Sequence, residues 1–162
     1  MTSARGFTLV ELVVMLVILG VLAVIAIPKF GGVASFNTMG FADRVQAGLR
    51  YAQKQAIAKR RNVCVAFTST KLTFTYAATA GTGVACSAAL TGPAGQSAFT
   101  IAPESGSTVT LSPVPAGLAF DALGRPIASA TGVALTSAVT ITIVGDSTRT
   151  LTVEPDTGHV HA

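Results

Sequence analysis

The sequence predicts an α+β fold in which a long N-terminal helix precedes an antiparallel, β-rich domain. An apolar run extends from Phe7 to Ile27, and a segment with helical periodicity follows Pro28. After Asn62 the period of the apolar residues changes from about 3.6 to about 2, which indicates strands. The same region is rich in Ala, Thr, Ser, Gly and Val and lacks Trp, a composition typical of strands and turns.

The first predicted element is a helix over residues 7–28, which follows a short leader, residues 1–6. The run from Phe7 to Ile27 covers about 21 residues, or roughly 31 Å as a helix, enough to cross the hydrocarbon core of a bilayer. Its single charged residue is Glu11, and a carboxylate at mid-membrane costs about 2.5–3.5 kcal/mol. Glu11 is therefore a candidate functional residue that needs a cationic partner. The alternative is a glutamate near a helix end whose carboxylate reaches water.

The start of the chain resembles the leader of type IV prepilins and type II secretion pseudopilins. The resemblance is carried by Gly6-Phe7-Thr8-Leu9-Val10-Glu11-Leu12, the unbroken apolar run and Pro28. It implies that a prepilin peptidase cuts between Gly6 and Phe7 and methylates the new amine of Phe7. Residues 7–28 would then anchor the subunit in the inner membrane and later form the filament core. Glu11 would meet the Phe7 amine of a neighbouring subunit and set the register of assembly, because opposite charges attract strongly in a low dielectric.

The resemblance also implies a single-pass topology with a cytoplasmic N-terminus and a periplasmic head, which agrees with Arg5 under the positive-inside rule. The implied partners are other pilin or pseudopilin subunits, prepilin peptidase, the inner-membrane assembly platform and membrane lipid. Because the periplasm is oxidising, we expect a disulfide between Cys64 and Cys86. It would close a loop of about 23 residues and contribute about 3 kcal/mol in the loop-entropy model. Two separate buried thiols are the alternative.

The second predicted element is an amphipathic helix over residues 29–61. Its apolar residues recur at spacings of three and four and form one stripe that should pack against a sheet: Phe41, Val45, Leu49, Ala52 and Ala56. Polar residues lie mostly off this stripe: Asp43, Arg44, Arg50, Gln53 and Lys54. Lys59, Arg60 and Arg61 fall in the last turn, where cations complement the helix dipole, and Asn62 is the predicted stop.

Residues 62–162 are predicted to form a β-rich head. Strands over 63–67 and 72–76 should pair, and the clearest hairpin joins 139–144 to 149–154 around Gly145-Asp146-Ser147. Shorter candidate strands cover 98–101, 108–111 and 118–120, and a turn is predicted at 121–126. Residues 77–95, rich in Gly, Ala, Thr and Ser, are predicted to form a loop tied down by the disulfide.

Three head segments narrow the resemblance to the FimT/GspH-type minor pilins. They are residues 50–63, residues 120–126 with the sequence Phe-Asp-Ala-Leu-Gly-Arg-Pro, and residues 149–160. In particular, the chain resembles the minor pilins of mannose-sensitive haemagglutinin pilus systems. This implies a pilin-like fold and a structural subunit that helps to initiate or cap a type IV pilus or a type II secretion pseudopilus. Residues 77–117 carry no such resemblance.

Charge is distributed unevenly along the chain, which has 11 basic and 7 acidic residues. Seven basic residues and one acid lie between Phe30 and Lys71, and two basic residues and five acids follow from Leu72. The basic segment could contact neighbouring subunits, anionic lipid or DNA. DNA uptake is the alternative function, because some minor pilins of this type resemble DNA receptors with a basic C-terminal tail. Here the tail carries His159 and His161, which are mostly neutral at pH 7, so DNA is a disfavoured partner.

No catalytic residue, cofactor or metal site is predicted. Asp156-Thr157-Gly158 matches an aspartic-protease triplet, but it is an ordinary turn sequence. The two tail histidines could bind a metal with Glu154 or Asp156, although a solvated tail is the favoured interpretation. A third functional class is a solitary membrane-anchored binding module, which Glu11 argues against because a mere anchor gains nothing from a carboxylate.

Overall fold

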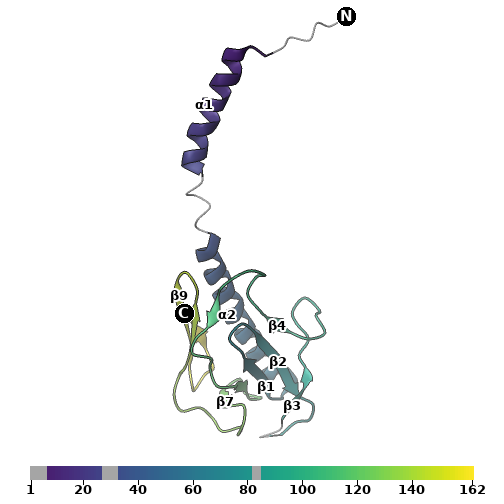
Figure 1. Ribbon diagram of the computed structural model, residues 1–162. Coiled ribbons are helices and arrows are strands. Elements are labelled where there is room, and N and C mark those ends of the chain that lie inside the picture. Colours follow the sequence, from purple (N-terminus) through teal and green to yellow (C-terminus); the bar gives the residue numbers. More distant parts are fainter. Residues whose placement is uncertain (1–6, 27–32, 82–84) are drawn as a thin grey trace, which may run out of the picture. The chain divides into compact units, whose positions relative to one another are not determined.

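A computed structural model describes residues 7–26, 33–81 and 85–162 (Figure 1). The chain divides into two compact units, Met1–Val33 and Ala34–Ala162. The first contains helix α1, Leu9–Ala26, whose 18 residues span about 27 Å. The end of the helix predicted over residues 7–28 lies outside the described residues, as does the leader. In the part of the chain that the structure describes, no helix is both long enough and apolar enough to cross a membrane.

Helix α2, Val33–Lys59, packs into the core of the second unit. The five residues of its predicted apolar stripe, from Phe41 to Ala56, are all fully buried. The helix ends before the predicted stop at Asn62, because Arg60 adopts a left-handed conformation with φ 50°. The N–H of Arg60 donates to Ile57, and the N–H of Arg61 donates to Ala56. These two bonds form a Schellman motif, which leaves Asn62 to pair with Ala77 in the first sheet.

The first sheet is antiparallel and contains six strands in the order β3-β2-β1-β6-β7, with β4 also paired to β2. The strands are β1 Val63–Phe67, β2 Leu72–Ala77, β3 Cys86–Ala89, β4 Thr100–Ile101, β6 Leu118–Phe120 and β7 Pro126–Ala128. Both β3 and β4 lie beside β2, on the side away from β1. Together they form one edge of the sheet.

The second sheet has four antiparallel strands in the order β10-β9-β8-β5. They are β5 Thr110–Leu111, β8 Val139–Val144, β9 Thr148–Val153 and β10 Val160–His161. The predicted C-terminal hairpin is confirmed, since β8 pairs with β9 and Ile141 lies opposite Leu151. Both side chains are buried, whereas Thr140 is exposed, as the alternation requires.

Two local predictions are wrong. Residues 77–95 do not form a continuous loop, because Cys86–Ala89 pairs with β2. The alternation in β3 uses Ala and Ser, whose small side chains give little hydropathy signal. The C-terminal segment is not a solvated tail, because Val160 pairs with Val153 and is fully buried. Strand β7 was also missed; it starts at Pro126 on the edge of the sheet, where a proline is tolerated.

One hydrophobic core joins α2 to both sheets. Its largest fully buried side chains include Phe41 of α2, Phe74 of β2, Phe120 of β6 and Ile141 of β8. The core extends from Phe41 to Val160 and therefore joins residues separated by about three quarters of the chain. It fixes the surface features of the head to α2.

Candidate functional site

The residues predicted to direct processing and assembly lie at the start of α1. Gly6 lies outside the described residues, and Phe7 precedes the helix with 75% of its surface exposed. Thr8 caps the helix: its Oγ1 accepts a hydrogen bond from the N–H of Glu11 at 3.3 Å, and its carbonyl accepts one from Leu12 at 3.2 Å. Thr-x-x-Glu is the sequence signature of a capping box. The signature was present in the sequence, but the cap was not predicted.

This geometry gives Glu11 a local role that is independent of any neighbouring subunit. Glu11 occupies the third helical position after the cap and lies in the first turn of α1. A carboxylate there interacts favourably with the positive end of the helix dipole. Any test of Glu11 in assembly must therefore separate its charge from its capping position.

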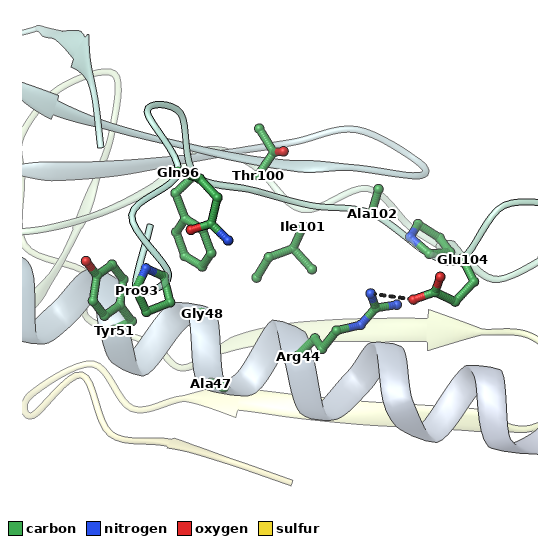
Figure 2. A pocket seen from close by; sticks show the side chains of 12 residues that line it. Arg44, Ala47, Gly48, Tyr51, Pro93, Gln96, Thr100, Ile101, Ala102 and Glu104 are labelled. Atoms are coloured by element: carbon green, nitrogen blue, oxygen red, sulfur yellow. Dashed lines mark ion pairs between the residues drawn. The ribbon is translucent and has the colours of Figure 1, made fainter. Parts of the chain in front are cut away.

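The head carries an open groove of about 710 Å³ between α2 and residues 93–104 (Figure 2). One face of α2 forms the first wall with Arg44, Ala47, Gly48 and Tyr51. The opposite wall is mostly apolar: Pro93, Gln96, Phe99, Thr100, Ile101, Ala102, Pro103 and Glu104. The volume lies within the roughly 300–1,000 Å³ typical of binding sites. The groove was not predicted from the sequence, and its outer wall comes from a segment in which no motif was recognised.

Small and aromatic residues shape the groove. A side chain on Gly48 would collide with Cδ1 of Ile101, so glycine allows β4 to lie close to α2. The ring of Tyr51 meets Phe99 edge-on with 5.4 Å between centroids, and Phe99 stacks on Phe74 at 4.5 Å. The hydroxyl of Tyr51 donates to the carbonyl of Thr91 at 2.9 Å. These contacts fix the floor of the groove before anything binds there.

An ion pair closes one end of the groove. Arg44 Nη1 lies 2.8 Å from Glu104 Oε1. Figure 2 marks this ion pair with a dashed line. The two side chains are 44% and 69% exposed, so the pair contributes little to stability. The groove is therefore mostly apolar along its length and electrically neutral at this end.

A second cluster holds the C-terminal strand to α2. The guanidinium of Arg50 donates two hydrogen bonds, of 2.7 and 3.0 Å, to the carbonyl of Val160. Nε2 of Gln53 donates to the carbonyls of Gly124 at 2.9 Å and Thr157 at 2.7 Å. These side chains lie off the apolar stripe, as predicted, but they anchor the C-terminal segment rather than only meeting solvent.

The two tail histidines are held beside Glu154. His161 Nε2 lies 2.9 Å from Glu154 Oε1, and the rings of His159 and His161 stack with 5.7 Å between centroids. The hydrogen bond to Glu154, followed by one to the backbone of Ala162, raises the pKa of His161 above its ordinary value. Within residues 7–26, 33–81 and 85–162, no group of three His, Cys, Asp or Glu side chains could hold a metal ion.

Cys64 and Cys86 are joined by a disulfide that links β1 to β3 across the intervening strand β2. The bond closes a segment with a sequence separation of 22 residues. It therefore ties the edge of the first sheet to its centre.

Comparison with known proteins identifies both parts of the chain. Residues 42–157 match the family described as type II transport protein GspH, and residues 1–27 match the prokaryotic N-terminal methylation motif. The crystal structure of the type IV minor pilin FimU of Pseudomonas aeruginosa strain PAO1 is similar, with a TM-score of 0.53 and 17% sequence identity. The likeness covers 76% of this chain and 85% of that one, and it shows the pilin fold. No curated protein matches the chain in sequence. Since the GspH match covers most of the chain, the chain belongs to the GspH family of pilin-like minor pilins and pseudopilins.

Proposed function

We propose that this protein is a minor pilin or pseudopilin that helps to initiate or cap a type IV pilus or a type II secretion pseudopilus. The observation that carries the proposal is the combination, on one chain, of an N-terminal methylation motif over residues 1–27 and a GspH-type head over residues 42–157. The motif would allow the subunit to be processed and incorporated into a filament. The head would provide the surfaces that distinguish a minor subunit from the bulk subunit. Family membership makes the chain a structural protein rather than an enzyme.

In this proposal, prepilin peptidase cleaves after Gly6 and methylates Phe7. Residues 7–28 then anchor the subunit in the inner membrane with its head in the periplasm, until the assembly platform moves it into a filament. Support comes from the apolar surface of α1, whose large side chains are exposed along its described length. Such a surface needs lipid or other helices around it. The disulfide between Cys64 and Cys86 fits an oxidising compartment.

Processing can be tested directly in the native host. Gly6→Glu should leave a full-length precursor in the membrane, because the peptidase site is expected to admit only a very small residue before the cleaved bond. Gly6→Ala is the matched control and should be processed. Mass spectrometry of the membrane fraction should find N-methylated Phe7 as the first residue in the wild type and the control. A mature N-terminus at another residue would refute the proposed processing.

DNA binding for uptake is the alternative function, and one observation favours it. Lys59 and Arg60 are exposed at the C-terminal end of α2, beside Arg61. The tail gives no further support, because Val160 is buried and His161 is held by Glu154. We expect the full-length protein in detergent to bind duplex DNA weakly, and binding near neutral pH to change little in His159→Ala/His161→Ala. Submicromolar binding at physiological salt that the double substitution abolishes would favour the DNA receptor instead.

A further inference from the structure

We propose that the groove between α2 and β4 receives an extended, uncharged segment of a neighbouring pilin-family subunit, which adds as a strand to the β4 edge of the first sheet. This inference rests on the proposed function, since it assumes that the chain has neighbours in a filament. It assigns to the segment from residue 93 to residue 104 a role in choosing the neighbour.

The first support is the free hydrogen-bonding edge of β4. Phe74 donates its N–H to the carbonyl of Phe99, and Leu72 lies opposite Ile101. In an antiparallel pair, hydrogen-bonded positions alternate, so the backbone groups of Thr100 and Ala102 point away from β2. Within the described residues, no loop or turn donates to these groups or accepts from them. Both residues are exposed, which leaves a short template for one more strand.

The second support is the match between the groove and a short extended chain. The groove follows α2 from Arg44 to Tyr51, a rise of about 10 Å over seven residues. Three residues of a strand also cover about 10 Å. In Figure 2, Ile101 points toward α2 whereas Thr100 and Ala102 point away from it. A strand added beside β4 would likewise direct alternate side chains toward Ala47, where small residues leave space.

The third support concerns charge. Among the described residues, the charged side chains that line the groove are Arg44 and Glu104, and they neutralise each other. A charged residue placed between them and Tyr51 would lose water without gaining an ion partner, which is costly. The groove therefore favours an apolar or neutral polar segment. A proline at a position that faces the edge is excluded as well, because it could not donate to the carbonyls of β4.

The fourth support is the size of the contact, which determines the kind of partner. A segment of about three residues buries far less than the roughly 1,200 Å² of a stable protein interface. Such a contact cannot hold a freely diffusing protein, but it can add affinity and selectivity to a partner that is already held elsewhere. In a filament, a neighbouring subunit is held through the N-terminal helices. That subunit is the occupant that the size of the groove fits.

The test uses the full-length chain, expressed in a deletion strain of the native host. A photoreactive benzoyl-phenylalanine replaces Gln96 on the rim of the groove, and Thr131, an exposed loop residue outside the groove, is the control position. Irradiation should join Gln96, but not Thr131, to a protein that mass spectrometry identifies by a methylated pilin N-terminus. A product that contains only a soluble periplasmic or secreted protein would overturn the proposal.

Second-site substitutions show whether binding in the groove itself produces the cross-link at position 96. Ala47→Trp fills the groove and should lower the yield of the cross-linked product at least about tenfold, as for loss of a central contact. Ala58→Trp, on an exposed part of α2 outside the groove, should leave the yield unchanged. Ala102→Pro removes one outward N–H and should act like Ala47→Trp, whereas Ala102→Val should not. An unchanged yield in both groove variants would refute strand addition.

A photoreactive residue at Leu16 of α1 distinguishes failure of the groove proposal from failure of the proposed function. If Leu16 cross-links to a pilin and Gln96 does not, the groove proposal fails and the subunit function stands. If neither position captures a pilin, both proposals fail. Thermal unfolding of each variant should match that of the wild type, which shows that the head is intact.

Discussion

Two glycines in α2 occupy contrasting environments. Apart from its own helix, Gly40 has no atom within 4 Å of the position where a Cβ would stand. A Cβ on Gly48, in contrast, would meet Ile101 and the ring of Phe74. Glycine inside a helix costs about 1 kcal/mol relative to alanine, so retaining it needs a reason in packing. That reason exists only at Gly48, where the close approach of β4 creates the floor of the groove.

Substitution of these glycines should therefore have opposite effects. Gly40→Ala should raise the free energy of unfolding by about 0.5–1 kcal/mol through helix propensity alone. Gly48→Val should lower it by about 1–3 kcal/mol, because the added methyl groups overpack the contact with Ile101. Urea unfolding, followed by circular dichroism, measures both. Equal stabilisation by the two substitutions would show that β4 does not pack on α2 as described.

The stability of the C-terminal strand should depend on pH through His161. Its pKa is raised by the hydrogen bond to Glu154, so the folded state binds the proton more tightly than the unfolded chain. The linked stability is fully present below the unfolded pKa of about 6.5 and is lost as pH rises through the higher folded value. Nuclear magnetic resonance titration of His161 should show the raised pKa, and Glu154→Gln should lower it toward the ordinary value. No change in Glu154→Gln would show that the contact does not persist in solution.

At the scale of elements, the end of α2 is formed by a residue in an unfavourable conformation. Arg60 supplies the left-handed residue of the Schellman motif, a position where glycine is preferred because it has no Cβ. Arg60→Gly should keep both capping hydrogen bonds and raise the free energy of unfolding by about 0.5–1 kcal/mol. Arg60→Ala, which keeps the Cβ, is the control and should have a smaller effect. Destabilisation by Arg60→Gly would show that the guanidinium makes a contact of its own.

Strongly periodic elements were predictable from the sequence, and weakly patterned ones were not. The buried stripe of α2 and the β8–β9 hairpin have large apolar residues at regular spacing, so their core faces were predicted correctly. Strand β3 consists of small residues and forms by pairing with β2. Strand β10 has only two residues and forms by pairing with β9. The groove was not predictable, because it requires β4 to lie beside α2, and no local pattern specifies that distant pairing.

The disulfide should stabilise the edge of the first sheet. Cys64–Cys86 closes a segment of 22 residues, for which the loop-entropy model gives about 3 kcal/mol. The free energy of unfolding of the Cys64→Ser/Cys86→Ser variant, measured in urea, should therefore be lower by that amount. Strand β3 should exchange its amide hydrogens sooner than β8. Ala130→Ser, a substitution at an exposed turn position, is the control for nonspecific effects. Uniformly faster exchange across both sheets would contradict local anchoring.

In the proposed function, the two units of the whole molecule separate attachment from recognition. The methylation motif and α1 belong to one unit, whereas the groove and the C-terminal cluster belong to the other. In the proposed filament, the first unit provides contacts that many pilin-like subunits can share. The head would then supply selectivity through residues 93–104, which line the groove and lie within the GspH match. Loss of the first function should prevent incorporation, and loss of the second should change which neighbour is chosen.

Glu11 is the residue on which incorporation should depend, and the capping geometry makes a sharp test possible. Glu11→Gln keeps a side chain that can complete a capping box but removes the charge, whereas Glu11→Ala removes both. Thr8→Ala removes the hydroxyl cap and keeps the charge, at a cost of about 1 kcal/mol in helix stability. All three proteins should insert into the membrane and be processed, because the apolar length and the Gly6–Phe7 bond are unchanged.

If Glu11 pairs with the Phe7 amine of a neighbour, Glu11→Gln and Glu11→Ala should both be depleted from sheared filaments, and Thr8→Ala should not. The depletion should be at least about tenfold, since leaving one charge of a buried pair without its partner costs about 3–5 kcal/mol. The loss is smaller if the subunit sits at the very tip, where no subunit lies above it. Complementation of a deletion strain, scored by filament yield and by the amount of this subunit in the filaments, measures the effect. Normal incorporation of Glu11→Gln together with failure of Glu11→Ala and Thr8→Ala would show that Glu11 serves the helix end and not the contact between subunits.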